Sequence, residues 1–358
     1  MKISLTLMNP LEDYRLAVEA EALGYDAMWF ADNPILWPDC YVMMALAAQA
    51  TTRIRLGTGI SVPGLRLAPV TAHSVASVNQ IAPGRTFLGI GVGGSGARLV
   101  GQKPMRLREF GEYLRVLRGL LHGEEVDYAG ESGTSSIRFL NAGAGFRNVE
   151  DRIPIYVAAN GPKALQLAGR YGDGVISMSG EDPDTIASRM KLIQQGATAA
   201  GRTLGDDFYS TIVTAVLVLR SGEKLTDERV INGTGALVTG MLHVTYANYQ
   251  QTGDESLVPP FMHGIWEEYR DYVESLDIPP ERRAYGLFEG HATHCLPHER
   301  RFVTPPLIEA CAVVAGPDEI AERVRQADAA GLSELSLTSP LVTQHELMHD
   351  FTEVMKRL

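Results

Sequence analysis

Short apolar runs of strand length alternate with longer segments of helical period along most of the chain. The first run, residues 3–7, precedes a periodic segment at 11–23 that stops at Gly24, as a helix often does. Continuous apolar runs are typical of parallel strands covered on both faces. The alternation predicts eight strands, at residues 3–7, 27–30, 54–58, 86–90, 155–158, 174–177, 212–219 and 335–337.

Helical periodicity fills most of the intervals between these strands. It predicts helices at 41–50, 70–81, 105–121, 162–171, 184–200, 317–330 and 343–358. Residues 125–140, with Gly130 and Gly133 between β-like flanks, are instead typical of a surface hairpin. Residues 221–306 break the rhythm, because they are rich in aromatic residues, His and Pro and contain several helical stretches.

Eight strand–helix units of this kind close into an α/β fold, the (β/α)8 TIM barrel. An open doubly wound sheet is the alternative, but the strand count and the lack of a linker favour the barrel. We therefore predict one domain over residues 1–358, with a helical insertion at 221–306 between the seventh and eighth strands.

Composition narrows the class of protein. The 358 residues carry a formal net charge of −11 and no Lys/Arg block, which argues against nucleic-acid binding. The three cysteines are widely spaced and form no CxxC pair, so neither a disulfide framework nor a cysteine zinc site is indicated. No run of about 18 apolar residues occurs. We expect a soluble, cytoplasmic protein that does not bind membranes.

The active site of a barrel lies at the carboxyl ends of its strands. Those ends include Asp32, Asn33, Thr58–Gly59–Ile60 and the glycine-rich run 91–94, but no His/Asp/Glu cluster for a metal and no Ser–His–Asp set. A polar mouth with few titrating groups suits a cofactor that brings its own chemistry.

The segment Asn160-Gly161-Pro162-Lys163 ends one predicted strand and opens the next helix, with Pro162 in the favoured first-turn position. Free N–H groups at the helix start, the helix dipole and Lys163 would together hold a phosphate or carboxylate. An ordinary turn with an exposed lysine is the alternative.

Two other motifs have competing interpretations. Residues 91–96 match G-x-G-x-x-G, but Lys103-Pro104 predicts that the helix begins only near Met105, which disfavours a dinucleotide site. Two interpretations of residues 91–96 stay open: a flexible loop, or a stretch of backbone that lines a planar ring. His291, His294 and His298 could bind a metal, but Pro297 interrupts helical spacing, so hydrogen-bonded histidines are favoured. Trp266, Tyr269 and Tyr272 are interpreted as the apolar face of one helix.

Several segments, in one order, resemble the bacterial luciferase-like superfamily: Arg53-Ile-Arg-Leu-Gly-Thr-Gly-Ile60, Pro83-Gly-Arg-Thr-Phe-Leu-Gly-Ile-Gly91, Lys103-Pro-Met-Arg-Leu-Arg-Glu109 and Ile153-Pro-Ile-Tyr-Val-Ala-Ala-Asn-Gly-Pro-Lys-Ala-Leu-Gln-Leu-Ala168, followed by 172–176. The branch they resemble is that of coenzyme F-420 (deazaflavin) reductases typified by methylenetetrahydromethanopterin reductase. The likeness covers residues 1–220 and 313–358, whereas 221–306 matches only loosely.

This resemblance implies a barrel whose mouth holds an isoalloxazine or deazaflavin ring. Gly59 and Ile60 fall where the family often has a non-proline cis peptide behind the ring. The remaining positions implied to bind cofactor are Asp32, Val62, Val92 and Gly93 along the ring or ribityl chain, and Asn160, Gly161, Pro162, Lys163 and Ala164 at the phosphate.

Sugar-phosphate dehydrogenases of the family have a His base where this chain has Asn33, and a Glu acid where it has Gly94. Reduction is therefore favoured over alcohol oxidation. Asp32 and Asn33 are the candidate catalytic residues, although Asp32 could equally hold the loop after the second strand.

The resulting hypothesis is hydride transfer from reduced coenzyme F-420 to a small organic substrate. An FMN-dependent monooxygenase using reduced flavin and oxygen is the runner-up, and a non-catalytic flavin-binding barrel is a third possibility. The family resemblance also implies a homodimer. No metal site is predicted.

Overall fold

The computed structural model describes residues 1–358, except for the side chain of Ala284. The chain packs into two compact units. The barrel unit comprises residues 1–213 and 324–336, and the helical unit comprises 214–323 and 337–358. Whether the two form one domain, as the sequence predicts, stays a prediction.

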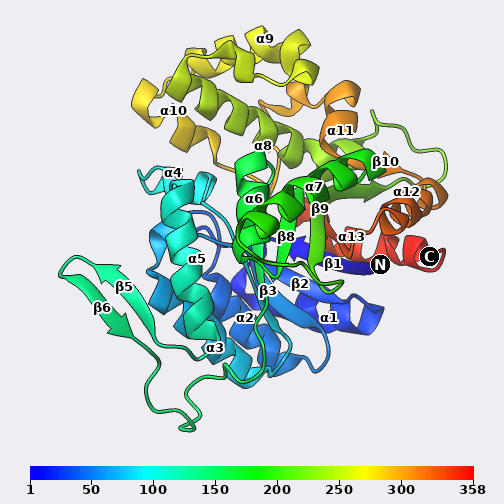
Figure 1. The fold of residues 1–358 in the computed structure, drawn as a ribbon. Helices are drawn as coiled ribbons and strands as arrows, with labels where there is room; N and C mark the ends of the chain where they lie inside the picture. The colour runs from blue at the N-terminus through cyan, green and yellow to red at the C-terminus, as the bar shows by residue number, and fades with distance from the viewer. The chain divides into compact units, whose positions relative to one another are not determined.

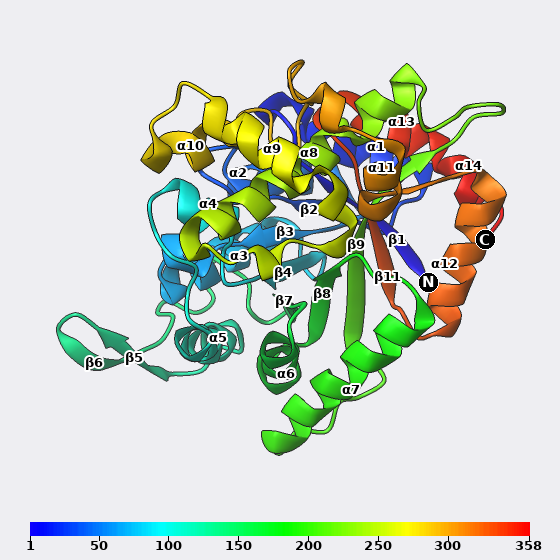
Figure 2. The same cartoon turned by 90° about the horizontal axis from the view of Figure 1, so that it is seen from above.

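Eight parallel strands form the closed barrel, which confirms the predicted (β/α)8 fold. They follow one another as β1, β2, β3, β4, β7, β8, β9 and β11, and β11 returns to β1 (Figure 2). Their bounds are β1 (Lys2–Leu7), β2 (Ala27–Phe30), β3 (Arg55–Ser61), β4 (Thr86–Ile90), β7 (Ile155–Ala158), β8 (Gly174–Met178), β9 (Tyr209–Val218) and β11 (Glu334–Thr338).

The helices of the barrel unit lie outside the strands (Figures 1 and 2). Most begin and end within three residues of the predicted positions, although the first opens as a 3-10 turn, η1 (Leu11–Arg15). The others are α1 (Leu16–Leu23), α2 (Cys40–Ala50), η2 (Pro63–Leu65), α3 (Ala68–Ile81), α4 (Ser95–Leu99), α5 (Leu107–Leu121), α6 (Pro162–Tyr171) and α7 (Pro183–Ala199).

Side chains at the amino ends of the strands fill the barrel. The Glu334 carboxylate accepts hydrogen bonds of 2.7 Å from Trp29 Nε1, Tyr209 OH and Ser4 Oγ. The Arg55 guanidinium lies 4.9 Å from the centre of the Phe87 ring and also faces other aromatic rings. This end of the barrel is therefore packed, and in barrels of this kind a site lies at the opposite end, where the strands finish.

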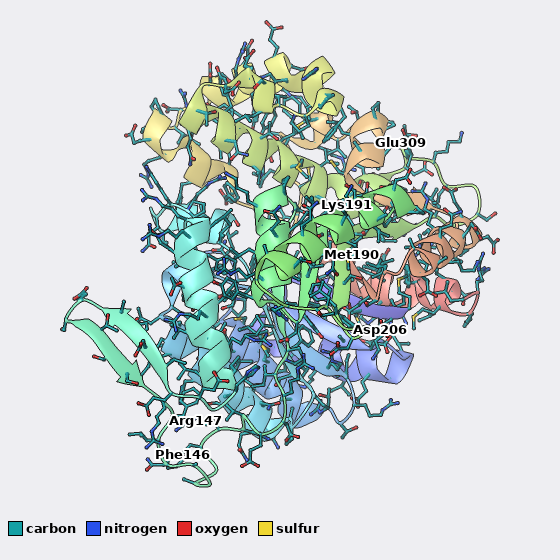
Figure 3. The ribbon with its side chains drawn as sticks, in the orientation of Figure 1. Phe146, Arg147, Met190, Lys191, Asp206 and Glu309 are labelled. Atoms are coloured by element: carbon teal, nitrogen blue, oxygen red, sulfur yellow. The ribbon has the colours of Figure 1, made fainter. Side chains whose placement is uncertain are left out.

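The predicted hairpin is present in the barrel unit as β5 (Val126–Gly130) and β6 (Gly133–Ile137), which pair antiparallel. Figure 1 shows the hairpin beside α5 and away from the barrel strands. Phe146 and Arg147, labelled in Figure 3, lie in the loop that follows it.

The helical unit contains the predicted insertion. Its elements are α8 (Glu228–Thr252), η3 (Glu255–Leu257), η4 (Pro260–Met262), α9 (His263–Ser275), α10 (Pro280–Leu287), η5 (Arg300–Phe302), α11 (Pro305–Cys311), β10 (Val313–Ala315), η6 (Leu341–Thr343), α13 (Gln344–Asp350) and α14 (Thr352–Met355), while α12 (Pro317–Ala329) continues from one unit into the other. As predicted, Trp266 and Tyr269 of α9 are buried in its core, and Tyr272 packs against it.

The helical unit contains one strand that the sequence did not predict, and it shows where the histidines of the insertion lie. The short strand β10 was not predicted, because three residues are too few to show a period; it pairs parallel with the second half of β9. His291 lies against α8, where a Cβ on Gly240 would be 3.3 Å from the imidazole. Among the described side chains, His291, His294 and His298 do not form a group of possible metal ligands.

No described helix combines the length and the apolar character that crossing a lipid bilayer requires.

Candidate active site

Asp32 follows β2 and is held by groups from the end of β3 and the turn after it. Its Oδ2 accepts from Arg66 Nη1 at 2.7 Å, Val62 N at 3.2 Å and Ser61 Oγ at 3.4 Å. The Asp32 side chain is only 2% exposed. The carboxylate therefore anchors the β2 loop to the β3 loop.

Arg66 binds two carboxylates, since its Nη2 also donates to Asp39 Oδ2 at 2.5 Å. Burial by itself lowers the pKa of Arg66, but Asp32 and Asp39 outweigh it and raise the pKa above its ordinary value. The guanidinium also lies 5.1 Å from the centre of the Tyr41 ring. Asp32 and Asp39 are therefore joined through one guanidinium.

The sequence did not reveal Arg66, because the residue lies in a turn with no motif and 34 positions from its partner. Asp39 could have been recognised, because it precedes an apolar helical segment as an N-cap residue does. The structure shows that its Oδ1 does accept from Tyr41 N and Val42 N.

Two side-chain donors in the β2 loop lack a protein partner. Asn33 is 1% exposed, and its Oδ1 accepts from Ile35 N at 3.1 Å, which leaves Nδ2 unpaired among the described residues. Trp37 Nε1 is likewise shielded and unpaired. Shielded donors of this kind suit an acceptor atom of a bound ligand.

Small and apolar residues meet at the ends of β3, β4 and β7. The Gly59–Ile60 peptide is cis, as the family resemblance implies. A Cβ on Gly91 would lie 2.4 Å from Ile60 Cδ1 and 2.8 Å from Ala158 Cβ. Ile60, Gly91 and Ala158 therefore lie together and form one apolar surface, called the floor below.

The glycine-rich loop after β4 packs on the loops of β2 and β3. A Cβ on Gly93, whose φ is +79°, would lie 2.4 Å from Val62 Cγ1. A Cβ on Gly96 would lie 3.8 Å from Asn33 Nδ2. The structure thus brings Asp32, Asn33, Val62 and Gly93 together, and Val92 precedes Gly93 in the chain.

The helix predicted to begin near Met105 is present as α5, but the expectation that no helix opens inside the motif is wrong. The helix α4 opens at Ser95, inside the motif, and α5 begins at Leu107. Three glycines among residues 91–94 hid α4 from a periodicity argument. The chain continues into α5 and the hairpin, so it does not form the strand–helix–strand unit that a dinucleotide motif requires.

The predicted anion-binding segment begins the helix α6. Gly161 is its extended N-cap residue, no side chain caps the helix, and Pro162 is its first residue. The residues Asn160, Gly161, Pro162 and Lys163 are exposed, and Ala164 is half-buried. The first backbone N–H groups of α6 and the lysine are therefore accessible to an anion.

Hydrogen bonds hold Asn160 of this segment and the residues that follow β8. Asn160 Oδ1 accepts from Met178 N at 3.0 Å, which ties the end of β7 to the end of β8. Arg189 Nη1 donates to Ser179 O at 2.7 Å and to Gly180 O at 3.3 Å. The strand β7 pairs with β4 and supplies Ala158 to the floor. The helix α6 begins directly after β7, so its start follows the floor in the chain.

Comparisons with known proteins identify the family and the fold of the chain. The sequence profile of the luciferase-like monooxygenase family matches residues 8–334. The F-420-dependent glucose-6-phosphate dehydrogenase of Kineococcus radiotolerans is 34% identical over 203 residues, which are 53% of this chain and 59% of that protein. The chain therefore spans less than two thirds of that relative's length.

Two further proteins are similar over nearly the whole chain. The 5,10-methylenetetrahydromethanopterin reductase of Archaeoglobus fulgidus is 27% identical over 353 residues, 95% of this chain and 94% of that protein. The solved structure of the coenzyme F-420 dependent tetrahydromethanopterin reductase of Methanopyrus kandleri has a TM-score of 0.73 and 21% identity, with 99% of each chain covered. The likeness to the Methanopyrus kandleri structure shows that the two chains share a fold.

Proposed function

The chain belongs to the luciferase-like monooxygenase family, and from this premise we propose that it is an oxidoreductase that transfers a hydride from reduced coenzyme F-420 to a small organic substrate. The observation that carries the proposal is the position of the uncapped α6 N-terminus at the end of β7, the strand that also supplies Ala158 to the floor. A ring and an anionic tail of one cofactor suit this pair of sites. The names of the relatives support F-420 as that cofactor.

In this proposal, Ile60, Gly91 and Ala158 contact one face of the ring. The first N–H groups of α6 and the Lys163 ammonium hold the phosphate. Asp32, Gly59, Val62, Val92 and Gly93 lie along the ring or the ribityl chain. When bound, the reduced deazaflavin supplies the hydride.

The chain's own groups orient the substrate and limit the proton chemistry. The ion pair of Asp32 with Arg66 keeps the β2 loop in place. Asn33 Nδ2 and Trp37 Nε1 donate hydrogen bonds to acceptor atoms of the bound molecules. An amide cannot remove a proton from an alcohol as an imidazole does, so reduction is the favoured direction and water is the expected proton source.

An FMN-dependent monooxygenase is the second candidate, and the description of the family itself favours it. A floor without titrating groups accepts a flavin ring as readily as a deazaflavin ring. The substrate stays unidentified beyond a small organic molecule, and the homodimer and the cytoplasmic location stay predictions.

Fluorescence titration of the full chain with F-420 and, separately, with FMN tests the cofactor. We expect a micromolar dissociation constant for F-420 and at least tenfold weaker binding of FMN. Tighter binding of FMN would transfer the proposal to the monooxygenase. Binding of neither would favour a barrel without this chemistry. With bound F-420, oxidation of the reduced cofactor by candidate acceptors, followed by its absorbance, then tests hydride transfer.

A further inference from the structure

The helix α13, labelled in Figure 1, has two histidines on one face. His345 and His349 are four positions apart, and residues at that spacing are neighbours on the surface of a helix. The centres of the two rings lie 4.6 Å apart, with 47° between the ring planes. The helical repeat therefore holds the two imidazoles side by side.

The two imidazoles are close enough to bind one metal ion. Each offers one ring nitrogen, and the two nitrogens lie within 4.8 Å of each other. Nitrogens that bind the same zinc ion, each about 2.0–2.1 Å from it, are roughly 3 Å apart. Both histidines are exposed, so a small rotation of either side chain closes this difference, and an ion reaches the pair from solvent.

The donor atoms indicate the class of ion that fits. Imidazole suits zinc, copper and nickel, whereas magnesium and calcium prefer carboxylate and carbonyl oxygens. The acidic residues of α13, Glu346 and Asp350, are engaged by Arg220 and Arg229 at 3.3–3.6 Å. This helix is therefore suited to a transition-metal ion and not to magnesium or calcium.

Another pair of histidines in the helical unit has the same spacing but not the same geometry. His294 and His298 are also four positions apart and exposed, but they lie outside the helices, with Pro297 between them. The two pairs match in side chain, spacing and exposure, and only His345 and His349 are aligned by a helix. His294 and His298 therefore provide a matched control.

We propose that His345 and His349 bind one divalent transition-metal ion of the zinc, copper and nickel class, with water or a carboxylate oxygen completing its coordination. The bound ion joins two successive turns of α13 and stabilises the folded state. Both histidines lie within the helix that the sequence predicts at 343–358, so their spacing could have indicated the pair. The site does not depend on the proposed function.

Calorimetric titration of the full chain, made without an affinity tag, with Ni²⁺ and separately with Zn²⁺ at neutral pH tests the proposal. We expect one ion per chain with a micromolar dissociation constant. His345→Ala and His349→Ala should each raise that constant at least tenfold, because one imidazole cannot chelate. The control His294→Ala/His298→Ala should bind as the unmodified protein does. No binding at micromolar concentration, or normal binding by either single variant, would overturn the proposal.

A second measurement needs no variant and keeps the test valid if a substitution prevents folding. In the unmodified chain loaded with one equivalent of Cu²⁺, electron paramagnetic resonance should show coupling of the copper to two imidazole nitrogens. Coupling to a single nitrogen would mean that the ion binds one histidine only, which contradicts the proposal. Circular dichroism verifies the fold of each variant used in the calorimetric titration.

Discussion

Arg66 Nη1 lies 2.7 Å from Asp32 Oδ2, and this contact joins the loop after β2 to the turn after β3. The Asp32 side chain is 2% exposed and that of Arg66 is 19% exposed, so water screens the pair only weakly. The one acidic residue of the predicted ring site is therefore occupied by an arginine of the same chain.

Removal of this arginine should destabilise the protein. We expect Arg66→Met to lower the free energy of unfolding by about 2–3 kcal/mol, because the Asp32 carboxylate loses a charged hydrogen-bond donor while it stays buried. Urea unfolding measures the change. In Asp32→Asn/Arg66→Met, where neither charge remains, part of the loss should be recovered. Equal stability of Arg66→Met and the unmodified protein would show that the ion pair contributes nothing.

Lys163 should contribute to cofactor affinity and not to folding, because its side chain is exposed at the start of α6. We expect Lys163→Ala to weaken binding of F-420 by about 1–2 kcal/mol, which is roughly a five- to thirtyfold rise in dissociation constant. Fluorescence titration measures it. Lys191→Ala on α7, also exposed and labelled in Figure 3, is the control and should bind normally. An unchanged constant for Lys163→Ala would mean that the lysine only contacts water.

The floor should not tolerate a side chain at Gly91. The new methyl group of Gly91→Ala would overlap Ile60 Cδ1 and Ala158 Cβ, so the Ile60 side chain must move toward the space assigned to the ring. We expect at least tenfold weaker binding of F-420, together with a loss of about 1–2 kcal/mol in stability.

Gly94→Ala is the matched control for this prediction. A Cβ at Gly94 meets no described atom within 4 Å, and its φ of −76° lies outside the left-handed region. The variant should bind F-420 with nearly the original affinity. If both variants bind equally well, the ring does not lie on the floor.

The barrel could be predicted from the sequence because its strands are continuous apolar runs separated by periodic helices. That pattern reports burial, which is a local property of each segment. The contact of Arg66 with Asp32 is a long-range property, and neither residue type nor spacing indicates it. The cis peptide at Gly59–Ile60 followed from a family resemblance and not from the local pattern, which at a glycine near a strand end is uninformative.

The anion-binding segment at the start of α6 could be predicted from the sequence only in part. Its strand, its Pro162 and its Lys163 were visible in the sequence, and α6 begins where they indicated. The hydrogen bond that Asn160 accepts was not visible, because its donor, Met178 N, lies at the end of the next strand. The unpaired donors of Asn33 and Trp37 likewise depend on what surrounds them, which the sequence does not report.

Acidification should destabilise the protein through His291. Burial, with a smaller effect of the neighbouring His243, lowers the pKa of His291 to about 3. In the unfolded chain the pKa is close to its ordinary value of about 6.5. Between these two values the unfolded state binds a proton that the folded state does not, so the stability that His291 contributes is complete above pH ~6.5 and is lost as the pH falls toward 3.

The variant His291→Asn should remove this pH dependence, because asparagine does not titrate. Between pH 7 and pH 5 the unmodified protein should lose up to about 2 kcal/mol more unfolding free energy than the variant does. Urea unfolding of both proteins at the two pH values measures the difference, and His73→Asn, which alters an exposed histidine of α3, is the control. Parallel pH profiles of the unmodified protein and His291→Asn would show that water reaches the imidazole in the folded state.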